Sequence, residues 1–202
     1  DAPVEHLSAE RFSEVLAAKF IGAWNLHLLT VKHPVQHFVI YSSAAAILGT
    51  AGQANYAAAS AAADALAHLR KANGLPALAI NWGVFADIGL AAAHSVRGDR
   101  LAHLGLPAIS PAEALQTLAD LLTENIPQIG AMRFDARKWV ASYPHRARWS
   151  LLSALLPKDH TKTPANSAAT LSQQIQDLPE AMAQQRLSRL VCQHIAAVIR
   201  LS

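Results

Sequence analysis

The chain has 202 residues, of which 52% are hydrophobic and 15% are charged, and its formal net charge is +3. This length is enough for one sizeable core, or for a core with an appendage. Lysines and arginines are scattered and form no basic stripe with interleaved aromatics, which argues against a nucleic-acid partner. The one cysteine, Cys192, excludes an internal disulfide framework and fits a reducing compartment. With no apolar run long enough for a membrane span and no signal peptide, the sequence predicts a cytoplasmic protein.

Helical and strand-like segments alternate along the first part of the chain. A helix is predicted over residues 8–30, because Ser8 can cap it and apolar residues recur at helical spacing. The sequence predicts two buried strands, over residues 36–42 and 76–82, and a helix over 53–72 between them. A strand, a helix and a strand of these lengths form the βαβ unit of a parallel sheet. The sequence therefore predicts an α/β fold.

The second part of the chain adds a mixed segment, a helix and a strand. Residues 87–108 show no regular pattern. The run Ser110-Pro111-Ala112-Glu113 is a capping box with proline at the first helical position, and it predicts a helix to about residue 123. A last short strand is predicted over 128–135. We expect the domain to close near residue 156.

Composition changes after residue 156. Residues 157–179 are polar and rich in Pro, Ser, Thr and Asn, which is typical of a flexible linker. Residues 180–202 carry apolar side chains at helical spacing and predict an isolated amphipathic helix. Because this helix has no evident apolar partner in the sequence, we interpret it as the first element of a truncated further domain.

Polar side chains gather around the loop between the first strand and the second helix. Ligands of doubly wound parallel sheets bind outside the carboxyl ends of the strands, where Ser43 is expected. Tyr56 stands near the start of the next helix, and Ser60 follows one turn later on the same face. An isolated tyrosine has a pKa of about 10, and a nearby ammonium group favours its phenolate. Lys19, on the preceding helix, is the candidate for that ammonium group.

These residues resemble a known family. The pair Ser43 and Tyr56 is similar to the serine–tyrosine pair of short-chain dehydrogenases/reductases. More narrowly, "FVIYSSAAAILGTAGQANYAAASAAADALA" followed by "GLPALAINWGVFADIGLA" resembles the ketoreductase domain of modular or iterative polyketide synthases. In that group the lysine lies on the preceding helix, in a segment like "VLAAKFIGAWNLH", and Lys19 matches it. The resemblance spans residues 1–156 and implies the C-terminal part of a Rossmann-like doubly wound sheet.

The resemblance implies a reaction and a role for each matched residue. NADPH would deliver hydride to a β-ketoacyl thioester, with Tyr56 as general acid, Ser43 as the hydrogen-bond donor to the carbonyl oxygen and Lys19 as the modulator of the tyrosine pKa. Ser60 stands where the family usually has Asn, so altered activity is expected. The segment that would lie beside the nicotinamide comprises Asn81, Trp82, Gly83 and Val84.

The same resemblance implies partners that the chain does not contain. No glycine-rich G-x-G-x-x-G turn is present, so the cofactor phosphates would be held upstream of Asp1, and the fragment alone is expected to be inactive. The substrate would be carried on the phosphopantetheine of an acyl carrier domain, whose attachment serine is absent here. The helix at 180–202 resembles the first helix of such a domain. Other synthase domains in cis and a homodimeric parent synthase are expected.

Two other functions and a metal site are alternatives to this interpretation. A non-catalytic, ketoreductase-like scaffold half usually lacks the Lys, Ser and Tyr together, so the joint presence of Lys19, Ser43 and Tyr56 favours an enzyme. A free-standing short-chain dehydrogenase is disfavoured by the position of Lys19 and by the tail helix. No metal is predicted, because Pro34 lies between His33 and His37 and no third ligand is near.

Overall fold

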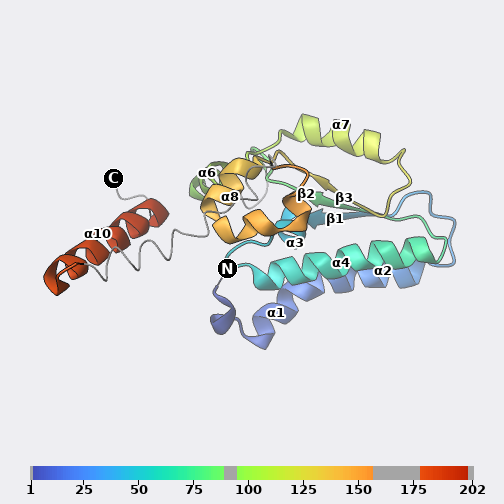
Figure 1. Cartoon of the computed structure of the whole chain (residues 1–202). Helices are drawn as coiled ribbons and strands as arrows, with labels where there is room; N and C mark the ends of the chain where they lie inside the picture. The colour runs from blue at the N-terminus through green and yellow to red at the C-terminus, as the bar shows by residue number, and fades with distance from the viewer. Residues whose placement is uncertain (1, 89–94, 157–177, 200–202) are drawn as a thin grey trace. The chain divides into compact units, whose positions relative to one another are not determined.

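The computed structural model describes residues 2–88, 95–156 and 178–199 (Figure 1). The chain divides into two compact units, Asp1–His145 and Arg146–Ser202. The first unit contains the sheet and all the predicted site residues. Among the described helices, none is long and apolar enough to cross a membrane.

The centre of the first unit is a three-stranded parallel sheet in the order β1-β2-β3. The strands are β1 (Val39–Ser43), β2 (Leu78–Trp82) and β3 (Gln128–Ala131). In the register of the first pair, Val39 lies opposite Leu78 and Ser43 lies opposite Trp82. All three strands therefore end at the same edge, as the predicted βαβ unit requires. The predicted α/β fold is confirmed.

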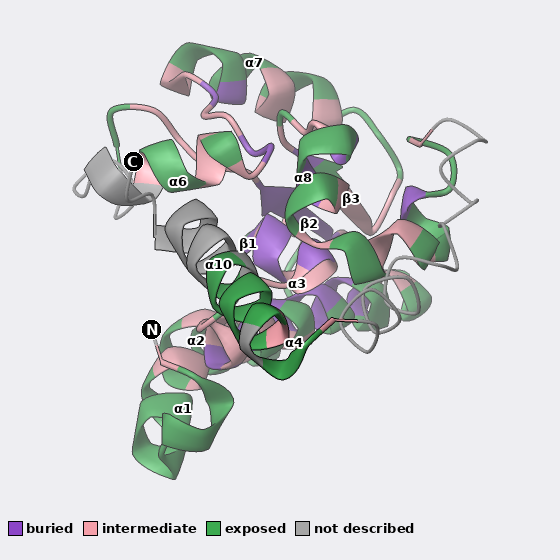
Figure 2. Cartoon of the chain, turned by 60° about the vertical axis from the view of Figure 1, so that its left-hand side comes forward, coloured by how far each residue is buried: buried purple, intermediate pink, exposed green. Residues whose placement is uncertain are grey.

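Helices cover both faces of this sheet. Figure 1 shows α7 (Pro111–Leu121) on one side and α4 (Ala54–Ala72) with α2 (Gly22–Thr30) on the other. Figure 2 shows that buried residues gather on the strands and on the sides of the helices that face them. Helices on both faces of a parallel sheet are the doubly wound arrangement.

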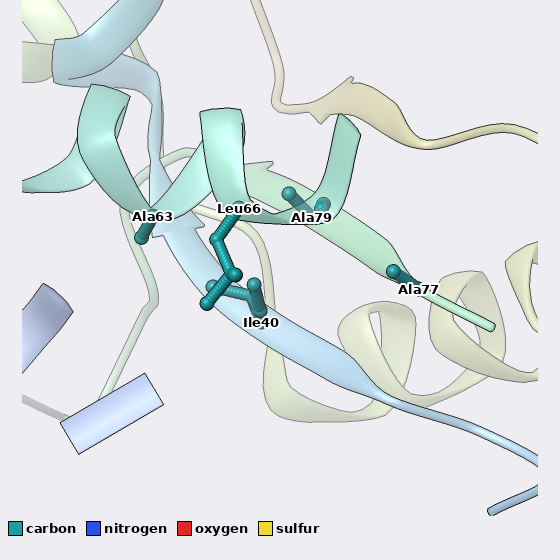
Figure 3. Close-up of a cluster of buried hydrophobic side chains, with 6 residues drawn as sticks. Ile40, Ala63, Leu66, Ala77 and Ala79 are labelled. Carbon is teal, nitrogen blue, oxygen red and sulfur yellow. The ribbon is translucent and has the colours of Figure 1, made fainter. Parts of the chain in front are cut away.

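Small side chains allow α4 to lie close to the sheet. Its buried residues form one core cluster with residues of β1, of β2 and of the segment just before β2 (Figure 3): Ile40, Ala63, Leu66, Ala67, Ala77 and Ala79. Four of these six are alanines, so helix and strands approach closely. The opposite face has a second cluster, formed by Leu78, Ile80, Trp82, Ile109, Ala114 and Ala131. The sheet thus has a packed core on each side.

The long N-terminal helix is continuous but changes its winding. It consists of α1 (Ala9–Leu16), a π-helical turn (Ala17–Ile21) and α2, and the Ser8 side chain accepts a hydrogen bond from the Arg11 N–H. The predicted helix over 8–30 and its cap are confirmed. The π turn, which includes Lys19, was not predicted. Such turns insert an extra residue into an α-helix and are frequent at functional sites.

Three elements differ from the sequence prediction. The short helix α3 (Ala44–Leu48) replaces a predicted loop, since Ser43 caps it by accepting a hydrogen bond from the Ala45 N–H at 3.2 Å. The helix α6 (Ser95–His103) occupies part of a segment predicted to be irregular. Strand β3 ends at Ala131 rather than near 135, because Asp135 is the N-cap of α8 (Ala136–Ser142). The capping box at Ser110 and Glu113 is present as predicted.

In the second unit, the chain forms the short 3-10 turn Ser150–Leu152 and the helix α10 (Glu180–Ile199). The helix was predicted from its apolar periodicity and is confirmed as a helix. Its exposed apolar side chains include Met182, Leu187 and Val191. The predicted linker at 157–179 lies outside the described residues except for its last two. The domain boundaries that depend on it stay a prediction.

Candidate active site

The structure brings two of the predicted site residues together. The Lys19 ammonium nitrogen lies 4.6 Å from the centroid of the Tyr56 ring, although these residues come from two different helices. The same nitrogen donates a hydrogen bond to the main-chain oxygen of Tyr41 on β1, at 3.3 Å. This second contact anchors the lysine to the sheet. A cation over an aromatic face is attracted by the ring, and it also stabilises negative charge on a phenol.

Tyr56 is held in place through its neighbour Asn55. The Tyr56 N–H lies in the first turn of α4, where main-chain donors have no partner within the helix. It donates instead to the Asn55 side-chain oxygen at 2.9 Å. The Asn55 amide nitrogen donates in turn to the main-chain oxygen of Arg11, at 3.2 Å. Asn55 therefore links the start of α4 to the helix that leads to Lys19, a role that was not predicted.

Ser43 occupies the end of β1 and the N-cap of α3. Its half-buried hydroxyl oxygen accepts from the Ala45 N–H, so the hydroxyl proton remains available for donation. Its main-chain oxygen accepts a hydrogen bond from the Asn81 side chain at 3.2 Å. Figure 1 shows α3 and the start of α4 at the same end of the sheet. This is the carboxyl edge, where ligands of such sheets bind.

The Ser60 side chain lies inside the protein. It is fully buried, and its hydroxyl has no hydrogen-bond partner among the described residues. Its main-chain oxygen accepts a hydrogen bond from the Ser42 hydroxyl at 3.3 Å. Ser60 thus joins α4 to β1, one helical turn after Tyr56.

The predicted nicotinamide segment begins in the core. The Asn81 side chain is fully buried and belongs to a polar network with Ser42, Asp64 and Gln128. Trp82 is buried too, and its ring lies between those of Tyr41 and Phe85, at centroid distances of 5.6 and 5.5 Å. Both side chains therefore fix where the strand ends.

The rest of this segment is tied down through its main chain. The Gly83 N–H donates to the Ala131 oxygen at 2.9 Å, and the Val84 oxygen accepts from the Ile109 N–H at 2.8 Å. A Cβ atom on Gly83 would lie 2.7 Å from the Cβ of Met132, so only glycine fits against the residue that follows β3. Val84 itself is half-buried. The segment leaves β2 along a defined path at the carboxyl edge.

The positions of the possible metal ligands bear on whether a metal ion could bind. Within residues 2–88, 95–156 and 178–199, no group of three or more His, Cys, Asp or Glu side chains could hold a metal ion.

Three residues that contact the candidate site were not identified from the sequence: Asn55, Asp64 and Gln128. Asp64 carried one signal that could have revealed it, since it is the one charged residue in the alanine-rich run that follows Tyr56.

Comparison with known sequences identifies related proteins. The KR domain family matches residues 1–87. A polyketide synthase of Streptomyces halstedii, GfsA, is 39% identical over 204 residues, which is 98% of this chain and 3% of the synthase. Mycoketide-CoA synthase of Mycobacterium tuberculosis is 36% identical over 208 residues, or 98% of this chain and 5% of the relative. The chain therefore spans a small part of the curated relatives it matches.

Several solved structures with a similar fold are ketoreductases. An A-type ketoreductase from a modular polyketide synthase superposes with a TM-score of 0.69 and 34% identity, over 72% of this chain and 30% of that one. The ketoreductase from the first module of phoslactomycin biosynthesis in Streptomyces sp. HK803 gives a TM-score of 0.72 and 27% identity. The match covers 78% of this chain and 36% of that one. A C2-type ketoreductase from a modular polyketide synthase gives a TM-score of 0.67 and 32% identity, over 78% of this chain and 34% of that one.

Proposed function

This chain belongs to the ketoreductase domains of polyketide synthases, and from that premise we propose that it helps reduce a β-ketoacyl thioester to a β-hydroxyacyl thioester with hydride from NADPH. The observation that carries the proposal is the position of the Lys19 ammonium group, 4.6 Å from the Tyr56 ring centroid. A phenol with a fixed cation beside it can give up a proton, because the cation stabilises the phenolate that remains.

In the proposed reaction, Tyr56 donates its phenolic proton to the substrate oxygen. The reduction adds a hydride to the β-carbon, the C=O bond becomes a C–O single bond, and the oxygen takes the proton from Tyr56. When bound, NADPH would supply that hydride and would be oxidised to NADP⁺. Lys19 stabilises the phenolate until solvent returns a proton to it. Its second contact, with the Tyr41 oxygen, keeps the ammonium group from swinging away.

Ser43 stabilises the oxygen on which negative charge develops. Its hydroxyl oxygen already accepts from the Ala45 N–H, and the proton is therefore free to point outward to the substrate carbonyl. A donor that is already oriented needs no reorganisation during the reaction, which is the basis of oxyanion stabilisation. Tyr56 and Ser43 would then donate to the same substrate oxygen.

Ser60 has no proton-transfer step in this mechanism. Serine lacks the amide that could both donate and accept at this position, and the enclosed hydroxyl has no partner among the described residues. Proton transfer therefore depends on Tyr56 and Lys19.

The described residues fit one part of an NADPH site. Ser43, Tyr56 and the half-buried Val84 belong to the carboxyl edge of the sheet, and the close packing of Gly83 on Met132 sets the path of the chain beyond β2. We propose that Asn81, Trp82, Gly83 and Val84 shape the nicotinamide end. A G-x-G-x-x-G turn for the phosphates is absent from the sequence, so the cofactor needs a further segment of the protein.

The partners follow from the same family. We propose an acyl carrier domain that bears the β-ketoacyl thioester on phosphopantetheine, and other synthase domains in cis. In this arrangement residues 1–156 belong to the ketoreductase, 157–179 form the linker and 180–202 begin the carrier domain. The parent synthase would be a homodimer. The large size of the relatives supports the arrangement, since the chain covers only 3% and 9% of two of them.

The test is reduction by the full-length protein. NADPH oxidation is measured with a β-ketoacyl thioester of N-acetylcysteamine, and Tyr56→Phe is expected to lower kcat by about 100- to 10,000-fold, the usual contribution of a general acid. Tyr143→Phe removes the hydroxyl of a tyrosine whose ring contacts that of Trp139, at a centroid distance of 4.9 Å, and it is the matched control, with unchanged kcat. Full turnover by Tyr56→Phe would overturn the assignment. An inactive, folded wild type that binds NADPH would favour the scaffold alternative.

A further inference from the structure

A buried polar network lies behind the candidate active site. The Asp64 carboxylate, 5% exposed, accepts from the Asn81 side-chain nitrogen at 2.8 Å and from the Gln128 side-chain nitrogen at 3.1 Å. The Gln128 nitrogen also donates to the Asn81 side-chain oxygen at 2.9 Å. The network therefore joins α4 to β2 and β3. Both bonds go to one carboxylate oxygen, and the other oxygen is buried with no hydrogen-bond partner among the described residues. Because a buried carboxylate is costly to retain, Asp64 depends on these two bonds.

The network ends on Ser43. The Asn81 nitrogen that donates to Asp64 also donates to the Ser42 hydroxyl at 3.1 Å and to the main-chain oxygen of Ser43 at 3.2 Å. Ser42 belongs to the face of the sheet that α4 covers, since its own hydroxyl donates to the Ser60 oxygen on that helix. The chain of contacts thus runs from the carboxylate to the peptide group of the proposed oxyanion residue.

Asp64 determines which way the Asn81 amide points. A carboxylate only accepts hydrogen bonds, so the amide must turn its nitrogen toward Asp64 and toward the Ser43 oxygen. The reversed amide would place its oxygen against two other acceptors. Gln128 favours the same orientation, because it donates to the Asn81 oxygen. Without Asp64, the Asn81 amide loses the charged acceptor that directs its nitrogen toward the Ser43 oxygen.

From this geometry we propose that Asp64 is a positioning residue of the reductase, which acts through Asn81 to hold the main chain of Ser43 so that the Ser43 hydroxyl faces the substrate oxygen. The inference rests on the proposed function and deepens it. Asp64 touches neither substrate nor cofactor, since it is buried between the helix and the sheet. Its effect reaches the reaction through the Ser43 peptide group, whose orientation also sets the hydroxyl that caps α3.

A double-mutant cycle in the full-length protein tests the proposal. Asp64→Leu removes the acceptor at similar size, and it is expected to lower kcat at least about tenfold, while the Kd for NADPH changes less than about twofold. In a Ser43→Ala background the same change is expected to add less than about twofold, because the group through which Asp64 acts is already gone. Asp64→Asn keeps an acceptor oxygen and is expected to restore most of kcat.

Two further measurements separate positioning from stability. Leu66→Ala, on the same helix and outside the network, is expected to lower the melting temperature without lowering kcat. Hydrogen exchange of residues 43–48 is expected to accelerate in Asp64→Leu and not in Leu66→Ala, since the Ala45 N–H donates to Ser43. Asp64→Ala replaces Asp64→Leu in all these measurements if the leucine variant does not fold.

The outcomes are distinguishable. Additive losses in the Ser43→Ala background, or unchanged kcat and exchange in Asp64→Leu, would overturn the positioning role and leave the reductase assignment standing. A wild type without reductase activity would overturn the proposed function, and the exchange measurement would still decide whether Asp64 holds Ser43.

Discussion

Asn55 connects the start of one helix to the main chain of another, since its amide nitrogen donates to the Arg11 oxygen at 3.2 Å. Its side-chain oxygen receives the Tyr56 N–H at 2.9 Å. One side chain therefore sets the distance between the proposed general acid and the helix that carries Lys19. Two elements far apart in sequence are thereby fixed to each other next to the proposed general acid.

Loss of Asn55 should disturb both stability and turnover. Asn55→Ala removes two hydrogen bonds to main-chain groups and is expected to lower the free energy of unfolding by about 1–2 kcal/mol, as such bonds contribute about 1 kcal/mol each. Because Tyr56 then loses its link to α1, kcat should fall as well. Chemical denaturation and steady-state kinetics measure the two effects.

The matched control for this change lies at the other end of α4. Asn73→Ala removes an exposed asparagine that donates to the Leu69 oxygen at 2.8 Å. It should affect stability slightly and kcat not at all. Equal loss of kcat in both variants would show that Asn55 has no particular connection to the site.

The Lys19 ammonium group should contribute to the rate rather than to the fold. Lys19→Met keeps most of the aliphatic chain and removes the charge beside Tyr56. We expect kcat to fall at least about tenfold, since each 1.4 kcal/mol of lost stabilisation costs about that factor. The exposed Lys32→Met is the charge-matched control. A Lys19→Met enzyme as fast as the wild type would remove the lysine from the mechanism.

Ser60 should be replaceable without loss of activity. Ser60→Ala removes a buried hydroxyl that has no hydrogen-bond partner among the described residues, so stability is expected to stay the same or to rise by up to about 1 kcal/mol. The rate is expected to change less than about twofold, because the proposed proton transfer does not pass through this side chain. A large fall in kcat at unchanged NADPH affinity would place Ser60 in the proton path.

Glu113 should add an acid-sensitive component to stability. The Ser110 N–H, the Ser110 hydroxyl and the Arg133 guanidinium lower the pKa of the Glu113 carboxyl from its ordinary value of 4.5. A carboxyl whose pKa is lower in the folded state stabilises the protein fully above its unfolded pKa. That contribution is lost as the pH falls through the folded pKa.

Glu113→Gln tests this component, since glutamine keeps the shape of the capping box and removes the titration. Its unfolding free energy should depend less on pH than that of the wild type below pH 4.5. Glu124→Gln, at an exposed position beyond the end of α7, is the control. The same pH dependence in the wild type and in Glu113→Gln would contradict the assignment.

Local signals in the sequence determined much of this fold. Helical periodicity and the caps at Ser8 and Ser110 predicted two helices, because capping and amphipathic spacing act within a few residues. The buried strands and the βαβ order predicted the parallel sheet. The resemblance of the segments around Lys19, Ser43 and Tyr56 to ketoreductases implied an active site and its chemistry.

Only the tertiary structure decided how these residues are held. The link from Asn55 to Arg11 and the contacts of Asp64 with Asn81 and Gln128 join segments that are distant along the chain, so no local pattern encodes them. Arg70 makes the same point. Arginine is mostly exposed in proteins, yet Arg70 is fully buried, with its guanidinium carbon 3.8 Å from the centroid of the Phe38 ring. Burial and hydrogen-bond partners depend on packing, because packing places side chains from distant segments of the chain in contact.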